Sequence, residues 1–203
     1  NGAVAVVIDE MVDGLPALLV QDVRKSYGQL ATAHRKQFDL PVFAVAGSNG
    51  KTSCKEMLAS ILREQFYALH SEASFNNDVG VPATLLRLTS RHELAVLEVG
   101  TNHPGELAPL IRMVSPQYGI LTGIGREHLE FFGDLEGVTK EEGMLAELLP
   151  GRGKLFLYGD GSWVKSIAQR SSSPYVTVGF DPRNDWQISE VQIEEGRTRF
   201  MLD

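Results

Sequence analysis

The chain has 203 residues, of which 43% are hydrophobic, and a formal net charge of -7 at pH 7. This composition is typical of a globular protein with a real core, and the lack of a basic cluster excludes nucleic acid as the main partner. The single cysteine, Cys54, excludes an internal disulfide bond, and no apolar run is long enough to span a bilayer. We therefore expect a cytoplasmic monomer that does not insert into membranes.

Residues 1–40 are interpreted as the end of an upstream domain and a connecting helix. The chain opens without a methionine, and strand-like apolar runs follow at residues 3–8 and 17–20. Asp22 can cap a helix that runs to about Gln37. Pro41 then interrupts the pattern, so we expect a second domain to occupy residues 41–203.

From Val42 onward, short and nearly continuous apolar strands alternate with helical segments. Four further strands are predicted, at residues 94–99, 118–122, 154–158 and 175–180. This order predicts an α/β fold with a mostly parallel sheet and helices on both faces. Residues 185–203 alternate polar and apolar side chains around Gly196, which predicts a small antiparallel hairpin at the C-terminal end.

Three helices of this second domain can be placed from residue patterns. The first is predicted at residues 52–66. Its apolar residues at helical spacing are Met57, Ile61 and Leu62. Pro82 and Pro104 are each expected in the first turn of a further helix, where proline is tolerated.

The most informative stretch follows the strand at Val42 and reads Gly47-Ser48-Asn49-Gly50-Lys51-Thr52-Ser53. Glycines free backbone N–H groups to bind phosphate oxygens, and the N-terminus of the next helix adds its positive dipole end. Lys51 is then expected to reach the terminal phosphates of a nucleotide, and the Thr52 hydroxyl to bind Mg²⁺. Two residues separate the glycines, instead of the usual four. The alternative is an ordinary strand-to-helix turn.

A polar loop, Asn76-Asn77-Asp78-Val79-Gly80, runs into the helix that contains Pro82. Paired asparagines offer both donors and acceptors, which suits a polyhydroxylated or phosphorylated ligand. Plain turn chemistry is an equally good explanation, because all of these polar residues and glycine favour turns.

Glu98 lies near the carboxyl end of the strand at residues 94–99, where open α/β sheets bind their ligands. Beside a phosphate loop, its carboxylate is well placed to hold Mg²⁺ directly or through water. The alternative is an exposed acid at the end of a strand. Asn102 and His103 follow in the next loop and are expected to face the same crevice.

His128 follows the next strand of the predicted sheet, in the stretch Gly125-Arg126-Glu127-His128-Leu129-Glu130. A lone histidine is most often a polar residue with a structural partner. Its position after a third sheet strand makes a functional role an equally good interpretation.

These four polar stretches occur in the same order in the Mur ligases, and the chain resembles that family over nearly all of its length. Mur ligases are ATP-dependent amide-forming enzymes of peptidoglycan synthesis. The resemblance is greatest to the member that joins D-alanyl-D-alanine to UDP-MurNAc-tripeptide. It implies a three-domain enzyme, of which this chain holds the end of the uridine-nucleotide-binding domain and most of the central domain, without the C-terminal domain.

The resemblance also implies a reaction and a set of residue roles. The terminal carboxylate of the muramyl peptide attacks the γ-phosphate of ATP, and the amine of the dipeptide displaces phosphate from the resulting acyl phosphate. Lys51 would neutralise phosphate charge, Thr52 and Glu98 would hold Mg²⁺, and His128 would help to hold a second metal ion. The residues that would line the route of the muramyl peptide are Asn76, Asn77, Asn102 and His103.

One departure from the family pattern bears on the metal site. Mur ligases commonly carry a carbamylated lysine downstream of the histidine, and ungapped alignment from His128 puts Glu142 at its place. We hypothesise that Glu142 supplies a permanent carboxylate where relatives build one from lysine and CO₂. The alternative is that Glu142 faces solvent and that Lys140 is modified instead.

Two other functions remain open from the sequence. The loop and metal pattern also occurs in the other Mur ligases and in folylpolyglutamate synthase, so the acceptor of the new amide bond could differ. Outside the enzyme class, the chain could be a nucleotide-binding module without ligase activity that acts by binding a partner.

Overall fold

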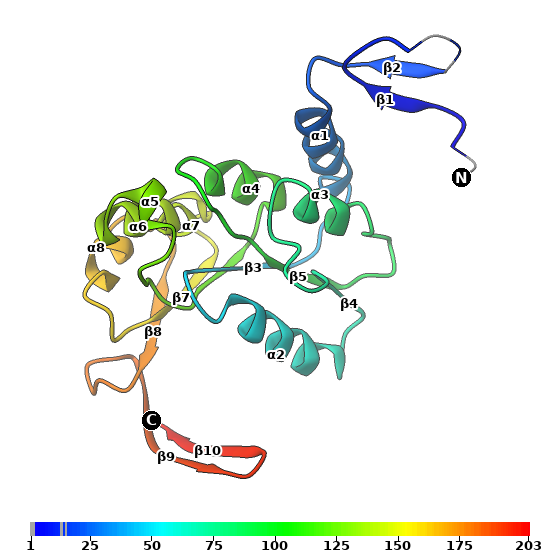
Figure 1. Ribbon diagram of the computed structural model, residues 1–203. Coiled ribbons are helices and arrows are strands. Elements are labelled where there is room, and N and C mark those ends of the chain that lie inside the picture. The colour runs from blue at the N-terminus through cyan, green and yellow to red at the C-terminus, as the bar shows by residue number, and fades with distance from the viewer. Residues whose placement is uncertain (1–2, 13, 15) are drawn as a thin grey trace.

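A computed structural model describes residues 3–12, 14 and 16–203, which form a two-stranded and an eight-stranded sheet (Figure 1). The first residue, Asn1, which stands in place of a methionine, lies outside the described residues. The small sheet pairs β1 (Val6–Ile8) in parallel with β2 (Ala17–Leu19), so the apolar run predicted at residues 3–8 is a strand only in its last part.

Helix α1 (Val23–Arg35) connects the small sheet to the main body. Asp22 caps it as predicted, because its side chain accepts a hydrogen bond from the Lys25 N–H at 2.9 Å. Gly28 and Ala31 are buried on the face of α1 that packs against α3 and α4. The helix therefore belongs to the packing of the main body along much of its length.

The main sheet has the strand order β10-β9-β8-β7-β6-β3-β5-β4, and every neighbouring pair is parallel except β9 with β10. Its strands are β3 (Val42–Ala46), β4 (Ala68–His70), β5 (Leu94–Glu98), β6 (Tyr118–Leu121), β7 (Lys154–Tyr158), β8 (Tyr175–Gly179), β9 (Trp186–Glu194) and β10 (Arg197–Leu202). The mostly parallel sheet and the C-terminal hairpin are confirmed. The short strand β4 was not predicted, because three residues carry too little periodicity.

One face of the sheet is covered by α2 (Lys51–Arg63) (Figure 1). The helix packs Cys54, Leu58 and Leu62 against a cluster of Val45, Leu94 and Val96. The helix predicted from the spacing of Met57, Ile61 and Leu62 is confirmed, but only Leu62 lies on its covered face, because Met57 and Ile61 are 65% and 69% exposed. Periodicity alone could not distinguish the covered face of α2 from its outer face.

The opposite face is covered by α1, α3 (Gly80–Leu85), α4 (Leu107–Val114) and α7 (Met144–Leu148), which pack on alternate residues of β3 and β5. Helices on both faces are thus confirmed. Pro82 lies in the first turn of α3 as predicted, but Pro104 precedes α4, whose first turn holds Pro109. The remaining helices are α5 (Leu129–Phe132), α6 (Leu135–Glu142) and α8 (Val164–Ala168).

Parallel pairing brings the carboxyl ends of β5, β3 and β6 side by side. The loop after β3 carries the phosphate-loop sequence. The loop after β5 carries the stretch that follows Glu98, and the loop after β6 carries the stretch before His128. The fold therefore collects at one sheet edge the segments that the sequence singled out. No helix within the described residues is both long enough and apolar enough to cross a membrane.

Candidate nucleotide and metal site

The loop between β3 and α2 is held in one shape by its two glycines and by the segment after β6. Gly47 and Gly50 have φ values of +116° and +81°, which favour glycine. A Cβ on Gly47 would lie 2.6 Å from the Thr122 hydroxyl oxygen, so a larger residue does not fit. The Ser48 N–H donates to the Gly123 carbonyl at 2.8 Å, and the Ser48 hydroxyl accepts from the Gly125 N–H at 2.8 Å.

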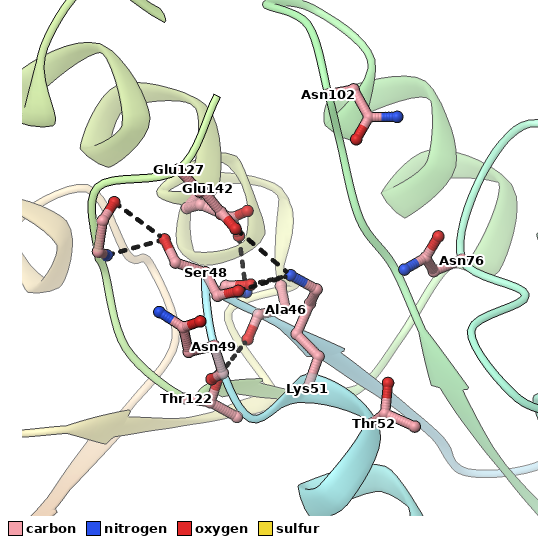
Figure 2. Close-up of polar contacts among 12 residues, drawn as sticks. Ala46, Ser48, Asn49, Lys51, Thr52, Asn76, Asn102, Thr122, Glu127 and Glu142 are labelled. Carbon is pink, nitrogen blue, oxygen red and sulfur yellow. Dashed lines mark hydrogen bonds and ion pairs between the residues drawn. The ribbon is translucent and has the colours of Figure 1, made fainter. Parts of the chain in front are cut away.

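Lys51 is the first residue of α2, and its amine folds back over the loop (Figure 2). It donates to the carbonyls of Gly47 and Ser48, and it lies 4.0 Å from the Glu127 carboxylate. The N-cap of α2 is Gly50, which supplies no side-chain hydrogen bond. The positive end of a 13-residue helix and a lysine amine therefore meet at the loop, an arrangement suited to an anion.

Glu98 is buried at the end of β5, with 1% of its surface exposed, so the alternative of an exposed strand-end acid is wrong. One carboxylate oxygen accepts from the Thr52 hydroxyl at 2.8 Å and the other accepts from the Asn76 amide at 2.8 Å. A hydroxyl and a carboxylate side by side at the start of the loop helix form a donor set that suits Mg²⁺.

The two asparagines of the polar loop have different surroundings. Asn76 lies beside Glu98, and its carbonyl accepts from the Gly100 N–H at 2.9 Å. The Asn77 side-chain oxygen accepts from the N–H groups of Val79 and Gly80, at 3.1 and 2.9 Å. The Asn77 side chain thus stabilises the turn that leads into α3, which is the alternative explanation considered for this loop.

Glu142 lies at the end of α6 with 1% of its surface exposed, so the alternative of a solvent-facing Glu142 is wrong, whereas Lys140 is exposed. One Glu142 oxygen accepts from the Gly47 N–H at 2.7 Å. The other, Oε1, is the one buried side-chain polar atom without a hydrogen-bond partner among the residues that the structure describes. Burial raises the pKa of Glu142 to about 7, and the nearby Lys51 charge opposes that rise.

His128 is exposed and precedes α5 with φ of +47°, a conformation that residues other than glycine rarely adopt. The part of the chain that the structure describes brings no three His, Cys, Asp or Glu side chains together as a metal site. The Thr52–Glu98 pair is thus one incomplete set of donors, and His128 is not joined to it.

A cavity of about 730 Å³ lies between α1, α4 and the loops after Asn76 and Val99. Asn77, Asn102 and His103 line it, whereas Asn76 lies at Glu98. The His103 Nδ1–H donates to the Glu106 carboxylate at 3.1 Å, and the ring contacts the ring of Phe131. The cavity therefore gathers three of the four residues that were expected to bind the substrate.

Two buried charged residues beside the site were not predicted from the sequence. Glu141 accepts from the N–H groups of Gly105 and Leu107, both at 2.9 Å, and so caps α4 from a neighbouring helix. Lys55 is fully buried in α2, one turn after Lys51. The sequence shows that α2 carries a lysine at position 55. Only the position of the sheet shows that this position lies on the covered face of the helix.

Comparisons with known proteins agree with this geometry. Residues 45–203 match the family model described as the Mur ligase middle domain. The whole chain is 40% identical, over 210 aligned positions, to the Escherichia coli UDP-N-acetylmuramoyl-tripeptide–D-alanyl-D-alanine ligase, of which it covers 45%. The chain therefore spans less than half the length of that relative.

Solved structures show the same similarity. A crystal structure of MurF from Acinetobacter baumannii superposes with a TM-score of 0.91 at 31% identity, over 98% of this chain and 44% of that one. MurF ligase from Thermotoga maritima in complex with ADP superposes with a TM-score of 0.90 at 25% identity, over 100% of this chain and 47% of that one.

Proposed function

The chain belongs to the Mur ligase family, and we propose that its protein joins D-alanyl-D-alanine to UDP-MurNAc-tripeptide in an ATP-dependent reaction. The observation that carries the proposal is the meeting of three features at one sheet edge. These are a glycine loop with its lysine, the buried Thr52–Glu98 pair, and the unpartnered oxygen of Glu142. The name of the E. coli relative supports the choice of substrates.

We further propose the domain organisation. Residues 1–40 form the end of a uridine-nucleotide-binding domain and a linker helix, and residues 41–203 form an incomplete central ATP-binding domain. The family match begins at residue 45, and the small sheet of β1 and β2 is separate from the main sheet, which supports this division. A C-terminal domain would complete the enzyme. The segment alone would bind nucleotide weakly and catalyse little.

The loop residues would hold ATP through its phosphates. In that state the amine of Lys51 leaves the carbonyls of Gly47 and Ser48 and turns toward phosphate oxygens, because a phosphate attracts an ammonium more strongly than a neutral carbonyl does. The remaining contacts come from the loop residues Gly47, Ser48, Asn49, Gly50, Thr52 and Ser53. Together they hold the phosphates in line with the attacking carboxylate and offset the charge repulsion between the two.

Thr52 and Glu98 would hold Mg²⁺ on the phosphate side of the loop. The ion would supply charge neutralisation for the transferred phosphoryl group. Glu98 fits this role because both of its oxygens are already oriented, one by Thr52 and one by Asn76. Asn76 then orients the carboxylate rather than contacting the muramyl peptide.

Glu142 and His128 would serve a second metal ion near the acyl phosphate. The buried Oε1 of Glu142 has no hydrogen-bond partner among the described residues, which is the state of a carboxylate whose partner is a ligand. His128 is on the α5 side of the same edge, and its exposed side chain is free to approach a ligand. Glu142 would thereby take the place of a carbamylated lysine.

The muramyl peptide would occupy the cavity of about 730 Å³ beside α1 and α4. Asn102 and His103, in the loop before α4, line its wall together with Asn77. Because the proposed reaction consumes ATP and a UDP-linked muramyl peptide, the expected compartment is the cytoplasm. A monomer is the expected state.

The test is phosphate release by the full-length protein. We expect release from ATP only when UDP-MurNAc-tripeptide and D-alanyl-D-alanine are both present, with an amide-linked pentapeptide as the product detected by mass spectrometry. A matched panel of earlier muramyl precursors and of folates with amino acids serves as the control. Activity with a panel member alone would replace the substrate assignment, and nucleotide binding without any release would mean a non-catalytic module.

A further inference from the structure

Of the residues that the structure describes, Lys55 has the largest fully buried side chain, with no exposed surface. Its amine donates to the carbonyl of Ser71 at 2.8 Å, to the carbonyl of Ala73 at 2.9 Å, and to the Glu56 carboxylate. An ammonium group has three donors, and all three are used here. A buried charge is costly unless it is satisfied in this way, so the segment that supplies the carbonyls is tied to α2.

That segment, residues 71–76, runs from the end of β4 to Asn76. Ser71 is joined to β5 on two sides, since its N–H donates to the Val96 carbonyl and its hydroxyl accepts from the Glu98 N–H, both at 3.1 Å. Ala73 then adopts φ of +44°, in the left-handed region that alanine rarely occupies. The amine of Lys55 binds the carbonyl of this same residue, so it holds the turn in its uncommon shape.

The turn ends at Asn76, whose amide nitrogen donates to Glu98. Asn76 is confined there, because a Cβ on Gly100 would lie 2.9 Å from that nitrogen. The second oxygen of Glu98 is bound by Thr52, which lies on α2 less than one turn before Lys55. Helix α2 therefore reaches Glu98 by two routes: directly through Thr52, and through Lys55, the turn and Asn76.

We propose that Lys55 is a positioning residue that sets the orientation of the Glu98 carboxylate, and so the affinity of the site for Mg²⁺, by fixing the turn that carries Asn76. Lys55 itself touches no substrate. This inference rests on the proposed function, because it assigns the Thr52–Glu98 pair to Mg²⁺. A purely structural role for Lys55 would lower stability and leave the metal dependence unchanged.

Arg35 provides a matched control on α1. It is also a buried basic residue, 5% exposed, and its guanidinium donates to backbone carbonyls of Val114, Phe38 and Ser115. Lys55→Met and Arg35→Met each remove a buried charge that binds backbone carbonyls. Only Lys55 is linked to Glu98 through the turn, so the two variants separate positioning from stability.

The experiment is calorimetric titration of full-length protein with ADP at a series of Mg²⁺ concentrations, together with thermal unfolding. For Lys55→Met we expect the Mg²⁺ concentration at half-maximal ADP affinity to rise about tenfold, as for removal of a group that orients a metal ligand, with unchanged ADP affinity in EDTA. Arg35→Met is expected to lower the unfolding temperature without this rise. Equal Mg²⁺ dependence in the two variants would overturn the inference.

Asn76→Ala keeps the inference testable if Lys55→Met does not fold. Asn76 is the last link to Glu98, so its replacement must give the same rise in the Mg²⁺ requirement, with little change in unfolding temperature. An unchanged Mg²⁺ requirement in Asn76→Ala would by itself exclude the link from Lys55 through Asn76 to Glu98. If the wild-type protein shows no Mg²⁺-dependent ADP binding, the proposed function fails instead, and the two failures are therefore distinguishable.

Discussion

Glu98 and Glu142 are two carboxylates with the same burial and opposite surroundings. Each has 1% of its surface exposed, and each lies beside the phosphate loop. Glu98 accepts a hydrogen bond at both oxygens, from Thr52 and Asn76. Within the described part of the chain, Glu142 accepts only one, from the Gly47 N–H. Equal burial therefore does not mean equal readiness to bind a ligand.

The difference shows which part of the site is complete before a ligand arrives. The α2 side is built from groups that satisfy one another, so the orientation of Glu98 is fixed in the free protein. On the α6 side, a carboxylate oxygen is buried without a donor, which costs free energy until a proton or a cation occupies it. We interpret Glu98 as pre-oriented and Glu142 as the carboxylate that responds to the bound state.

The largest effect is expected at Glu98. In the full-length enzyme, Glu98→Ala should lower turnover roughly 10³-fold, because it removes a metal ligand and leaves Thr52 and Asn76 without their partner. Steady-state phosphate release measures this. Glu93→Ala is the control, since Glu93 precedes the same strand and also accepts a hydrogen bond, from the Tyr67 N–H. Similar turnover in both variants would remove Glu98 from the metal site.

A smaller effect is expected at Glu142. Glu142→Ala should lower turnover roughly 10²-fold, because the second carboxylate is lost while the first metal position remains. Glu142→Lys should regain activity when bicarbonate is added, since a carbamylated lysine restores a carboxylate. Lys140→Ala, exposed on the same helix, is expected to keep full activity. Full activity of Glu142→Ala without bicarbonate would show that this carboxylate is not needed.

The unpartnered oxygen also predicts how stability depends on pH in the protein without metal or nucleotide. The folded-state pKa of Glu142 is raised to about 7 from 4.5, so the folded protein retains this proton at pH values where the unfolded chain has lost it. Stability should therefore fall as pH rises between these values, by about 1.5 kcal/mol from pH 5.5 to 7. Glu142→Gln, which cannot ionise, should lack this part of the slope.

Urea unfolding in EDTA at several pH values measures the difference between wild type and Glu142→Gln. Because the two proteins differ only at this side chain, the titrations of all other groups cancel to first order in the difference. Parallel curves for the two proteins would mean that Glu142 is already satisfied in solution, and the contrast with Glu98 would be lost. Addition of Mg²⁺ and ADP should reduce the slope, since a cation favours the ionised carboxylate.

Much of the fold could be predicted from the sequence because its signals are local. The strands β3, β5, β6, β7 and β8 are apolar runs that end at turn residues, and the loop at Gly47 is defined by glycines whose conformation only glycine adopts readily. Asp22 similarly caps α1 by a contact three residues away. These features need no knowledge of the rest of the molecule.

The parts that could not be predicted depend on contacts between distant residues. Glu142 meets Gly47 across 95 positions, and Glu98 meets Asn76 across 22. Lys55 is buried because its amine binds carbonyls of the turn after β4, and that turn was not predicted. Pro104 was placed in the wrong turn for the same reason, because α4 is capped by Glu141 from another helix.

The smallest effect is expected at Ala73, within the turn that orients the Glu98 side. Ala73→Gly should raise the free energy of unfolding by about 0.5–1 kcal/mol, because glycine adopts φ of +44° without the steric cost of a Cβ. Ala83→Gly in α3 is the control and should lower it by about 1 kcal/mol, as glycine does within a helix. Urea unfolding measures both changes.

The Mg²⁺ requirement of Ala73→Gly adds a second result to the same comparison. The amine of Lys55 binds the backbone carbonyl at this position, which glycine keeps, so the turn should retain its shape and the requirement should not change. A gain in stability with an unchanged requirement would mean that the contact with Lys55, and not the alanine side chain, fixes the turn. A loss of stability like that of Ala83→Gly would instead mean that the left-handed turn is unstrained. The orientation of Glu98 would then not depend on Lys55 holding a strained turn.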